Sequence, residues 1–172
     1  MAVNLSVRNL LEPTLIDRVA ELVDRSAVPP GALTLEITGS GVMADPEAAI
    51  ALLWGLRRIG VRLSIDDFGT GYSSLAYLKR LPVDEVKLDK SFVLNMTGDA
   101  DDAAIVRSTI ELAHNLGLQL VAEGVEDQET LELLATLGCD LVQGYHLARP
   151  MPANELANLQ HHPGPFTASP TA

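Results

Sequence analysis

Short apolar runs with alternating polar positions recur along the chain, and longer amphipathic stretches separate them. In residues 33–38, Leu33, Leu35 and Ile37 share one face of an extended segment, and the residues between them share the other face. Runs of this kind predict six β-strands, at residues 2–6, 33–38, 62–66, 85–89, 118–123 and 141–145. Strands that alternate with helices favour a parallel α/β sheet with covering helices.

The stretches between the strands carry helix start and stop residues. Asp45 and Pro46 open a helix that ends before Gly60, and Asp127 opens one that ends before Gly138. Residues 102–116 have apolar positions at helical spacing, and residues 13–26 predict the first helix. The expected chain is therefore a series of about six βα units.

A polar side chain able to bind a metal ion or a phosphate stands at or near the end of every predicted strand. These residues are Asn4, Glu36, Asp66 with Asp67, Lys87, Glu123 and Gln143. Each could singly be a cap or an ion pair, but the whole set is hard to attribute to turn chemistry. In a parallel barrel the carboxyl ends of the strands meet on one face, where such enzymes hold their active sites.

Asp66 and Asp67 place two like charges side by side, which favours a cation between them. The alternative is a solvated Asp-Asp turn before a helix, because Asp, Gly, Thr and Ser are common turn residues. Carboxylates and an amide, without His or Cys, favour Mg²⁺ or Mn²⁺. Two such ions could activate a water and stabilise a leaving oxygen, so the candidate reaction is phosphodiester hydrolysis.

Composition and the absence of long apolar runs argue against several other classes of protein. The net charge of −11 argues against a surface for a nucleic acid polymer, which needs clustered Lys and Arg. No apolar run approaches the roughly 20 residues of a membrane span, and the first residues lack a signal-peptide pattern, so we expect a cytoplasmic protein. Cys139 is expected to be a small buried residue. Residues 157–172, which include His161 and His162, are expected to be a disordered tail rather than a metal site.

Several motifs resemble the EAL-domain family of bacterial cyclic di-GMP phosphodiesterases. They are Val3-Asn4-Leu5-Ser6, Leu35-Glu36-Ile37-Thr38, the run from Asp66 to Leu75, Val86-Lys87-Leu88-Asp89, Ala122-Glu123-Gly124-Val125-Glu126, Gln143-Gly144-Tyr145 and Arg149-Pro150. In order and spacing they cover residues 1–156. The resemblance implies an incomplete TIM-type (β/α) barrel with about six of its eight βα units, followed by the tail.

The resemblance also implies roles for individual residues. Asn4, Glu36, Asp66, Asp67 and Glu123 correspond to the ligands of Mg²⁺ or Mn²⁺, with two ions expected. Lys87 would hold the attacking water, so the catalytic candidates are Glu123, Lys87 and Asp67. Gln143 and Glu126 would lie near the substrate, cyclic di-GMP, and residues 68–75 would contribute to a homodimer interface.

Two departures from the family pattern leave alternatives open. The chain contains no Glu-Ala-Leu segment, whose Glu is a metal ligand in the family, and Gly39 stands where members carry a Glu that anchors the Asp-Asp-Phe-Gly loop. Metal binding, and with it the activity of this chain, is expected to be weaker. One alternative is a catalytically inactive module that binds cyclic di-GMP or a protein partner. Another is an aldolase that uses Lys87 as a Schiff base, which the five nearby acids disfavour by keeping the lysine protonated.

Overall fold

A computed structural model describes residues 1–71 and 75–156. Contacts between residues group the chain into two compact units, one of residues 1–87 and 115–118 and the other of residues 88–114 and 119 onward. Each unit is described by itself. Within the described residues no helix is long and apolar enough to cross a membrane.

The first unit is built on four strands in the order β1-β2-β3-β4. Their bounds are Ala2–Leu5 (β1), Thr34–Thr38 (β2), Arg62–Phe68 (β3) and Glu85–Leu88 (β4), which ends at the boundary between the units. β1 and β2 pair in parallel with Asn4 opposite Glu36, and β2 and β3 pair in parallel with Glu36 opposite Ser64. This register places side chains of equal parity side by side on one face of the sheet.

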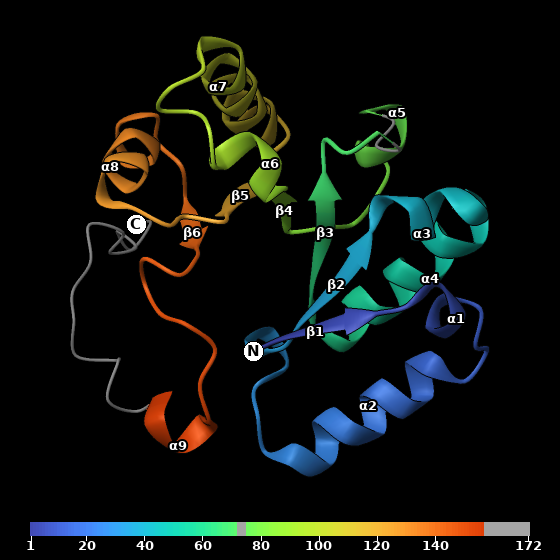
Figure 1. Ribbon diagram of the computed structural model, residues 1–172. Helices are drawn as coiled ribbons and strands as arrows, with labels where there is room; N and C mark the ends of the chain where they lie inside the picture. The colour runs from blue at the N-terminus through green and yellow to red at the C-terminus, as the bar shows by residue number, and fades with distance from the viewer. Residues whose placement is uncertain (72–74, 157–172) are drawn as a thin grey trace. The chain divides into compact units, whose positions relative to one another are not determined.

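The apolar face of the first unit packs against helices. Leu35, Ile37, Leu63 and Ile65 are at most 3% exposed. The two long helices of the unit, α2 (Leu15–Ser26) and α4 (Pro46–Ile59), lie side by side in Figure 1. The side chain of Asp45 accepts a hydrogen bond from the Ala48 backbone at the start of α4. The shorter elements are α1 (Val7–Leu10), η1 (Pro30–Ala32), α3 (Gly39–Ala44) and α5 (Leu75–Leu78).

The second unit pairs β5 (Gln119–Glu123) in parallel with β6 (Leu141–Gln143), so that Glu123 stands opposite Gln143. Its helices are α6 (Lys90–Val93), α7 (Ala100–Asn115), α8 (Gln128–Thr136) and α9 (Ala153–Leu156). The buried residues Val106, Ile110 and Ala113 recur at helical spacing along α7 and form its core face.

All six predicted strands and all four predicted helices are present, with ends that differ by up to about three residues. The predicted strand at residues 62–66 continues to Phe68, so both aspartates belong to β3 rather than ending it. The predicted tail, residues 157–172, lies outside the described residues, and so does part of the predicted dimer loop at residues 68–75.

Candidate active site

A buried ion-pair group lies on the polar face of the first unit. The Lys87 Nζ is 3.0 Å from Glu36 Oε1 and 3.1 Å from Asp66 Oδ1. The three side chains are only 6%, 9% and 15% exposed. Removing charges from water costs several kcal/mol per ion unless they are paired, so this arrangement requires all three partners.

Strand parity brings these residues together. Glu36 is in the middle of β2, and Asp66 follows Ser64 by two positions on β3. On β4, the side chain of Lys87 lies on the face opposite to that of its neighbour Val86. Residues separated by two positions on a strand share a face, so the three side chains converge on the same side. The structure therefore places Glu36 and Lys87 on the polar face that the alternation of the sequence predicts.

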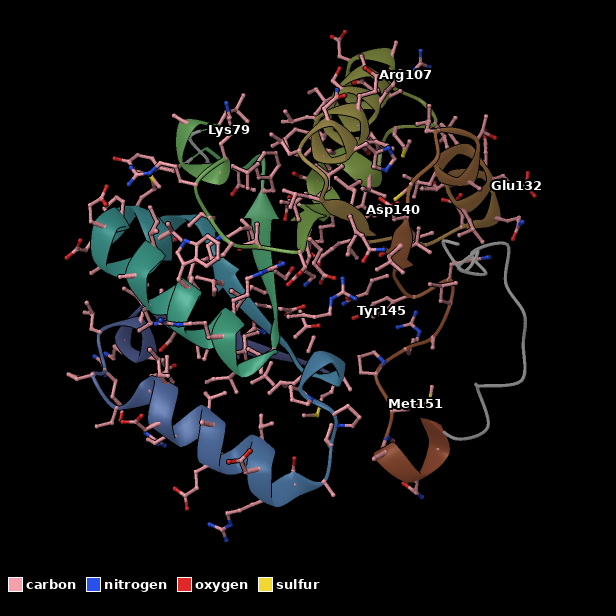
Figure 2. All side chains as sticks on the ribbon, turned by 180° about the vertical axis from the view of Figure 1, so that it is seen from behind. Lys79, Arg107, Glu132, Asp140, Tyr145 and Met151 are labelled. Atoms are coloured by element: carbon pink, nitrogen blue, oxygen red, sulfur yellow. The ribbon has the colours of Figure 1, made fainter. Side chains whose placement is uncertain are left out.

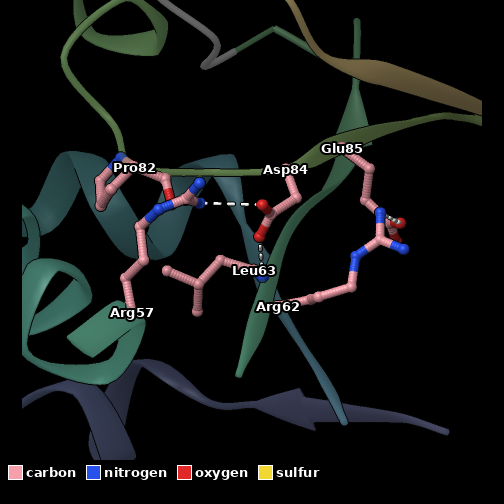
Figure 3. Close-up of polar contacts among 6 residues, drawn as sticks. All are labelled: Arg57, Arg62, Leu63, Pro82, Asp84 and Glu85. Atoms are coloured by element: carbon pink, nitrogen blue, oxygen red, sulfur yellow. Dashed lines mark hydrogen bonds and ion pairs between the residues drawn. The ribbon is translucent and has the colours of Figure 1, made fainter. Parts of the chain in front are cut away.

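A second set of contacts fixes where β4 begins (Figure 3). The Asp84 carboxylate accepts a hydrogen bond from the Leu63 backbone at 2.9 Å, and its other oxygen pairs with Arg57 at 2.9 Å. The Asp84 backbone in turn donates to the Leu63 carbonyl at 2.9 Å, and Arg62 pairs with Glu85 at 3.2 Å. We use the name aspartate clasp for the contact of Asp84 with a strand amide and with a basic side chain from the preceding long helix. It sets the register of β4 three residues before Lys87.

Asp67 adopts an unusual backbone conformation, with φ of 54°. Its backbone donates to Asp66 Oδ1 at 3.1 Å, and its carbonyl accepts from the Thr70 hydroxyl at 2.9 Å. Neighbours on a regular strand point to opposite faces. The left-handed residue breaks that alternation, and a carboxylate oxygen of Asp67 lies within 4.8 Å of one from Asp66. Two oxygen ligands thereby come within reach of one cation.

Asn4 and Asp67 are the exposed candidates in the first unit. It lies opposite Glu36 in the β1–β2 register, so the two side chains leave the same face of the sheet. An amide oxygen and three carboxylates therefore occupy neighbouring positions of β1, β2 and β3.

In the second unit, Glu123 is the half-buried last residue of β5. Gly124 follows with φ of 76°, and a Cβ at this position would lie 2.5 Å from the Lys90 Cβ of α6. Both the backbone conformation and the close approach require glycine. The chain therefore turns sharply directly after the Glu123 carboxylate.

Gln143 is the last residue of β6, and Glu126 lies on the loop that follows β5. The Gln143 carbonyl accepts a hydrogen bond from the Val125 backbone at 3.1 Å, and the Val125 carbonyl accepts one from the His146 backbone at 3.0 Å. Gly144 packs directly on the Val125 backbone, which leaves no room for a side chain. Glu126 is exposed and stands between this contact and Asp127, the cap of α8.

A pocket of about 280 Å³ opens beside Gln143 in the second unit. Its lining includes Tyr145, whose ring lies 4.7 Å from the guanidinium carbon of Arg149. Pro150 and Met151 complete the apolar side. An amide, a cation and an aromatic ring thus surround one small cavity.

A second aspartate clasp precedes β6. The Asp140 carboxylate, labelled with Tyr145 in Figure 2, accepts from the Leu120 backbone at 2.8 Å and contacts His114 Nε2 at 2.9 Å. Cys139 beside it is buried, and desolvation raises the pKa of its thiol to about 11. The expectation of a buried Cys139 is confirmed.

Comparisons with known proteins identify the family of the chain. The sequence-family model described as the EAL domain matches residues 1–150 of the chain. The chain belongs to the EAL-domain family. The chain is 47% identical over 156 residues to the bifunctional diguanylate cyclase/cyclic di-GMP phosphodiesterase MucR of Pseudomonas aeruginosa. The alignment covers 91% of this chain and 23% of MucR. It is 44% identical over 152 residues to the cyclic di-GMP phosphodiesterase NbdA of the same organism, and this alignment covers 88% of this chain and 19% of NbdA.

Solved EAL structures share the fold. A complex of the MucR phosphodiesterase with c-di-GMP superposes with a TM-score of 0.85 at 48% identity, covering 90% of this chain and 63% of that one. The EAL domain of DcpA from Mycobacterium smegmatis gives a TM-score of 0.87 at 42% identity, and the superposition covers 92% of this chain and 71% of that one. The predicted fold class, an incomplete TIM-type (β/α) barrel with six βα units, is confirmed. The EAL chain spans less than a quarter of the two curated relatives.

Three features of the site had no counterpart in the sequence-based prediction: the left-handed Asp67, the aspartate clasps and the buried Ser64. A signal for the clasps exists, because Asp84-Glu85-Val86 and Asp140-Leu141-Val142 both place an Asp immediately before a strand. Ser64 has no such signal, since a serine within an apolar run is common in strands.

Proposed function

We propose that this EAL domain hydrolyses one phosphodiester bond of cyclic di-GMP to give the linear dinucleotide, with divalent cations as cofactors. The observation that carries the proposal is the buried group of Glu36, Asp66 and Lys87. Charged groups are rarely buried without a specific partner, and clusters of this kind mark functional sites.

The donor set fits Mg²⁺ or Mn²⁺. Asn4, Glu36, Asp66, Asp67 and Glu123 offer only oxygen atoms, which these hard cations prefer. Two ions fit the number of carboxylates. When bound, the cations would polarise the phosphodiester and lower the pKa of a coordinated water.

The side chains divide the remaining work. Lys87, held by two carboxylates, is a fixed ammonium group that can orient a water or a phosphate oxygen by donating hydrogen bonds. Asp67, next to the last residue of β3, and Glu123, the last residue of β5, would bind the cations. Glu126 and Gln143 would contact the substrate, and the pocket beside Gln143 offers an aromatic ring and Arg149 to a purine or its phosphate.

The rest of the proposal concerns the setting of the reaction. We propose that the EAL-type domain comprises residues 1–156 and that it acts in the cytoplasm. We also propose that it forms a homodimer through an interface that includes residues 68–75. The family membership and the c-di-GMP complexes of its structural relatives support the choice of ligand.

A second candidate function is binding of cyclic di-GMP without hydrolysis. Gly39 favours it, because this residue only opens α3, where Thr38 supplies the cap by accepting from the Gly41 backbone at 3.3 Å. A glycine has no side chain to hold the loop after Asp67.

The decisive experiment incubates the purified chain with cyclic di-GMP and either Mg²⁺ or Mn²⁺, and measures binding and linear product separately. For the enzyme, we expect product that disappears with EDTA and with Glu123→Ala. Glu129→Ala, which changes an exposed glutamate of α8, is the matched control and should retain the product.

The two functions differ in outcome. Binding with no product at saturating Mn²⁺ supports the binding module. If a chain that unfolds cooperatively shows no binding and gives no product, both functions are refuted.

A further inference from the structure

Ser64 is a buried polar residue that the roles above do not use. It lies in the middle of β3 and is 0% exposed. Its Oγ has no hydrogen-bond partner among the residues that the structure describes. Buried hydroxyls are nearly always hydrogen-bonded, because leaving one without a partner forfeits its interaction with water. A residue needed only for packing at this position would be better as alanine.

The position of Ser64 relates it to the candidate metal ligands. It stands directly opposite Glu36 in the β2–β3 register, on strands that are about 4.8 Å apart. It also precedes Asp66 by two residues on the same strand, so its side chain leaves the same face as the Asp66 carboxylate. The hydroxyl is therefore adjacent to two of the three members of the buried ion-pair group.

In the structure, the Glu36 carboxylate pairs with Lys87 and makes no hydrogen bond with Ser64. Glu36 Oε1 is directed to Lys87 Nζ at 3.0 Å. A cation that attracts this carboxylate competes with the lysine for the same oxygen atoms. The terminal torsion of a glutamate is soft, so its carboxylate can turn at small cost.

We propose that Ser64 is a positioning residue that donates a hydrogen bond to the Glu36 carboxylate when a divalent cation is bound. The inference rests on the proposed metal site and adds a residue that acts through a ligand. Carboxylate ligands are commonly held by such hydrogen bonds, and losing one typically weakens metal affinity 10- to 100-fold.

The test uses Mn²⁺ alone and four chains: the wild type, Ser64→Ala, Ser64→Thr and Ser64→Val. Thr and Val have nearly the same shape and differ in the hydroxyl, so together they separate hydrogen bonding from packing. Calorimetric titration gives the Mn²⁺ Kd, and thermal unfolding in EDTA gives the stability without metal.

We expect Ser64→Ala to unfold in EDTA at the wild-type temperature or a few degrees above it, because it removes an unsatisfied buried hydroxyl. Its Mn²⁺ Kd should rise on the order of 10-fold or more. Ser64→Thr should bind Mn²⁺ more tightly than Ser64→Val by a similar factor.

Equal Mn²⁺ affinity of the wild type and Ser64→Ala would overturn the role of Ser64 while leaving the metal site in place. Equal affinity of the Thr and Val variants, both weaker than the wild type, would assign the effect to packing and overturn it too. A folded wild-type chain that binds no Mn²⁺ would overturn the metal site itself, and the inference with it.

Discussion

Lys87 and Glu36 form an ion pair with 3.0 Å between Nζ and Oε1, and each side chain is less than a tenth exposed. Asp66 completes the group from the next strand at 3.1 Å. In the structure, the lysine thus supplies the positive charge that these carboxylates need. In the proposed function a bound cation would add to that charge, and the lysine and the metal would then share the same two acids.

Lys87→Met should show this dependence directly. Without the ammonium group two buried carboxylates lose their partner, and we expect a loss of about 3–5 kcal/mol in the free energy of unfolding in EDTA. Saturating Mn²⁺ should recover more stability in the variant than it adds to the wild type. Urea unfolding with and without Mn²⁺ measures both effects.

Lys79→Met is the matched control, since Lys79 is exposed on the loop after α5. It should change the free energy of unfolding by less than about 0.5 kcal/mol. If the two methionine variants were equally stable in EDTA, the buried ion-pair group would not exist in solution.

Gly144→Ala should disturb the contact between the two loops of the second unit. A Cβ at this position would collide with the Val125 backbone, which cannot move as a flexible side chain could. We expect a loss of about 1–3 kcal/mol in the free energy of unfolding, together with weaker ligand binding through Gln143. A Cβ at Gly98 would lie 3.9 Å from the Asn95 carbonyl oxygen, an ordinary contact, so Gly98→Ala should behave like the wild type in the same unfolding experiment.

Cys139 should react slowly with thiol reagents in the native protein. Burial raises the pKa of its thiol to about 11, so the thiolate fraction at pH 8 falls on the order of 100-fold below that of an ordinary cysteine. Labelling with a chromogenic disulfide reagent should be correspondingly slow, and it should become fast in denaturing urea. Equal rates in both conditions would show that the thiol is accessible in the native state.

Asp127 should make the stability of α8 depend on pH. The Thr130 backbone and hydroxyl donate to its carboxylate and hold its pKa below the ordinary value. Because the folded state binds the proton more weakly, this stabilisation is complete above the unfolded-state pKa of about 3.9. It is lost as the pH falls through the folded-state pKa.

Asp127→Asn keeps an acceptor at the cap but does not titrate. The difference in melting temperature between the wild type and this variant should therefore be largest near neutral pH and shrink in acid. Asp127→Ala should melt below Asp127→Asn at every pH, because it has no cap. A wild-type advantage that grew in acid would contradict the assignment.

The strands could be predicted because their signal is local. Alternation in residues 33–38 defined an apolar and a polar face, and the structure keeps both faces. The short helices α1, α3, α5, α6 and α9 were not predicted. Four to six residues contain too few turns for a helical period to be visible in the sequence.

The site was predictable to the level of which residues share a face, and no further. The partners of Lys87 depend on the register of three strands. Asp84 fixes the start of β4 beside β3 through its contact with Leu63, which is 21 residues away in the sequence. The left-handed Asp67 depends on the turn that Thr70 closes. Such relationships between distant or strained residues leave no period in a single sequence.

The aspartate clasp occurs twice, with Arg57 and Asp84 in one unit and with His114 and Asp140 in the other. Each clasp fixes a strand at its beginning, whereas the candidate catalytic residues lie toward the strand ends. Alignment of the strands and the chemistry of the site are thus assigned to opposite edges of each sheet. A substitution at one edge is therefore expected to leave the alignment of the strands at the other edge unchanged.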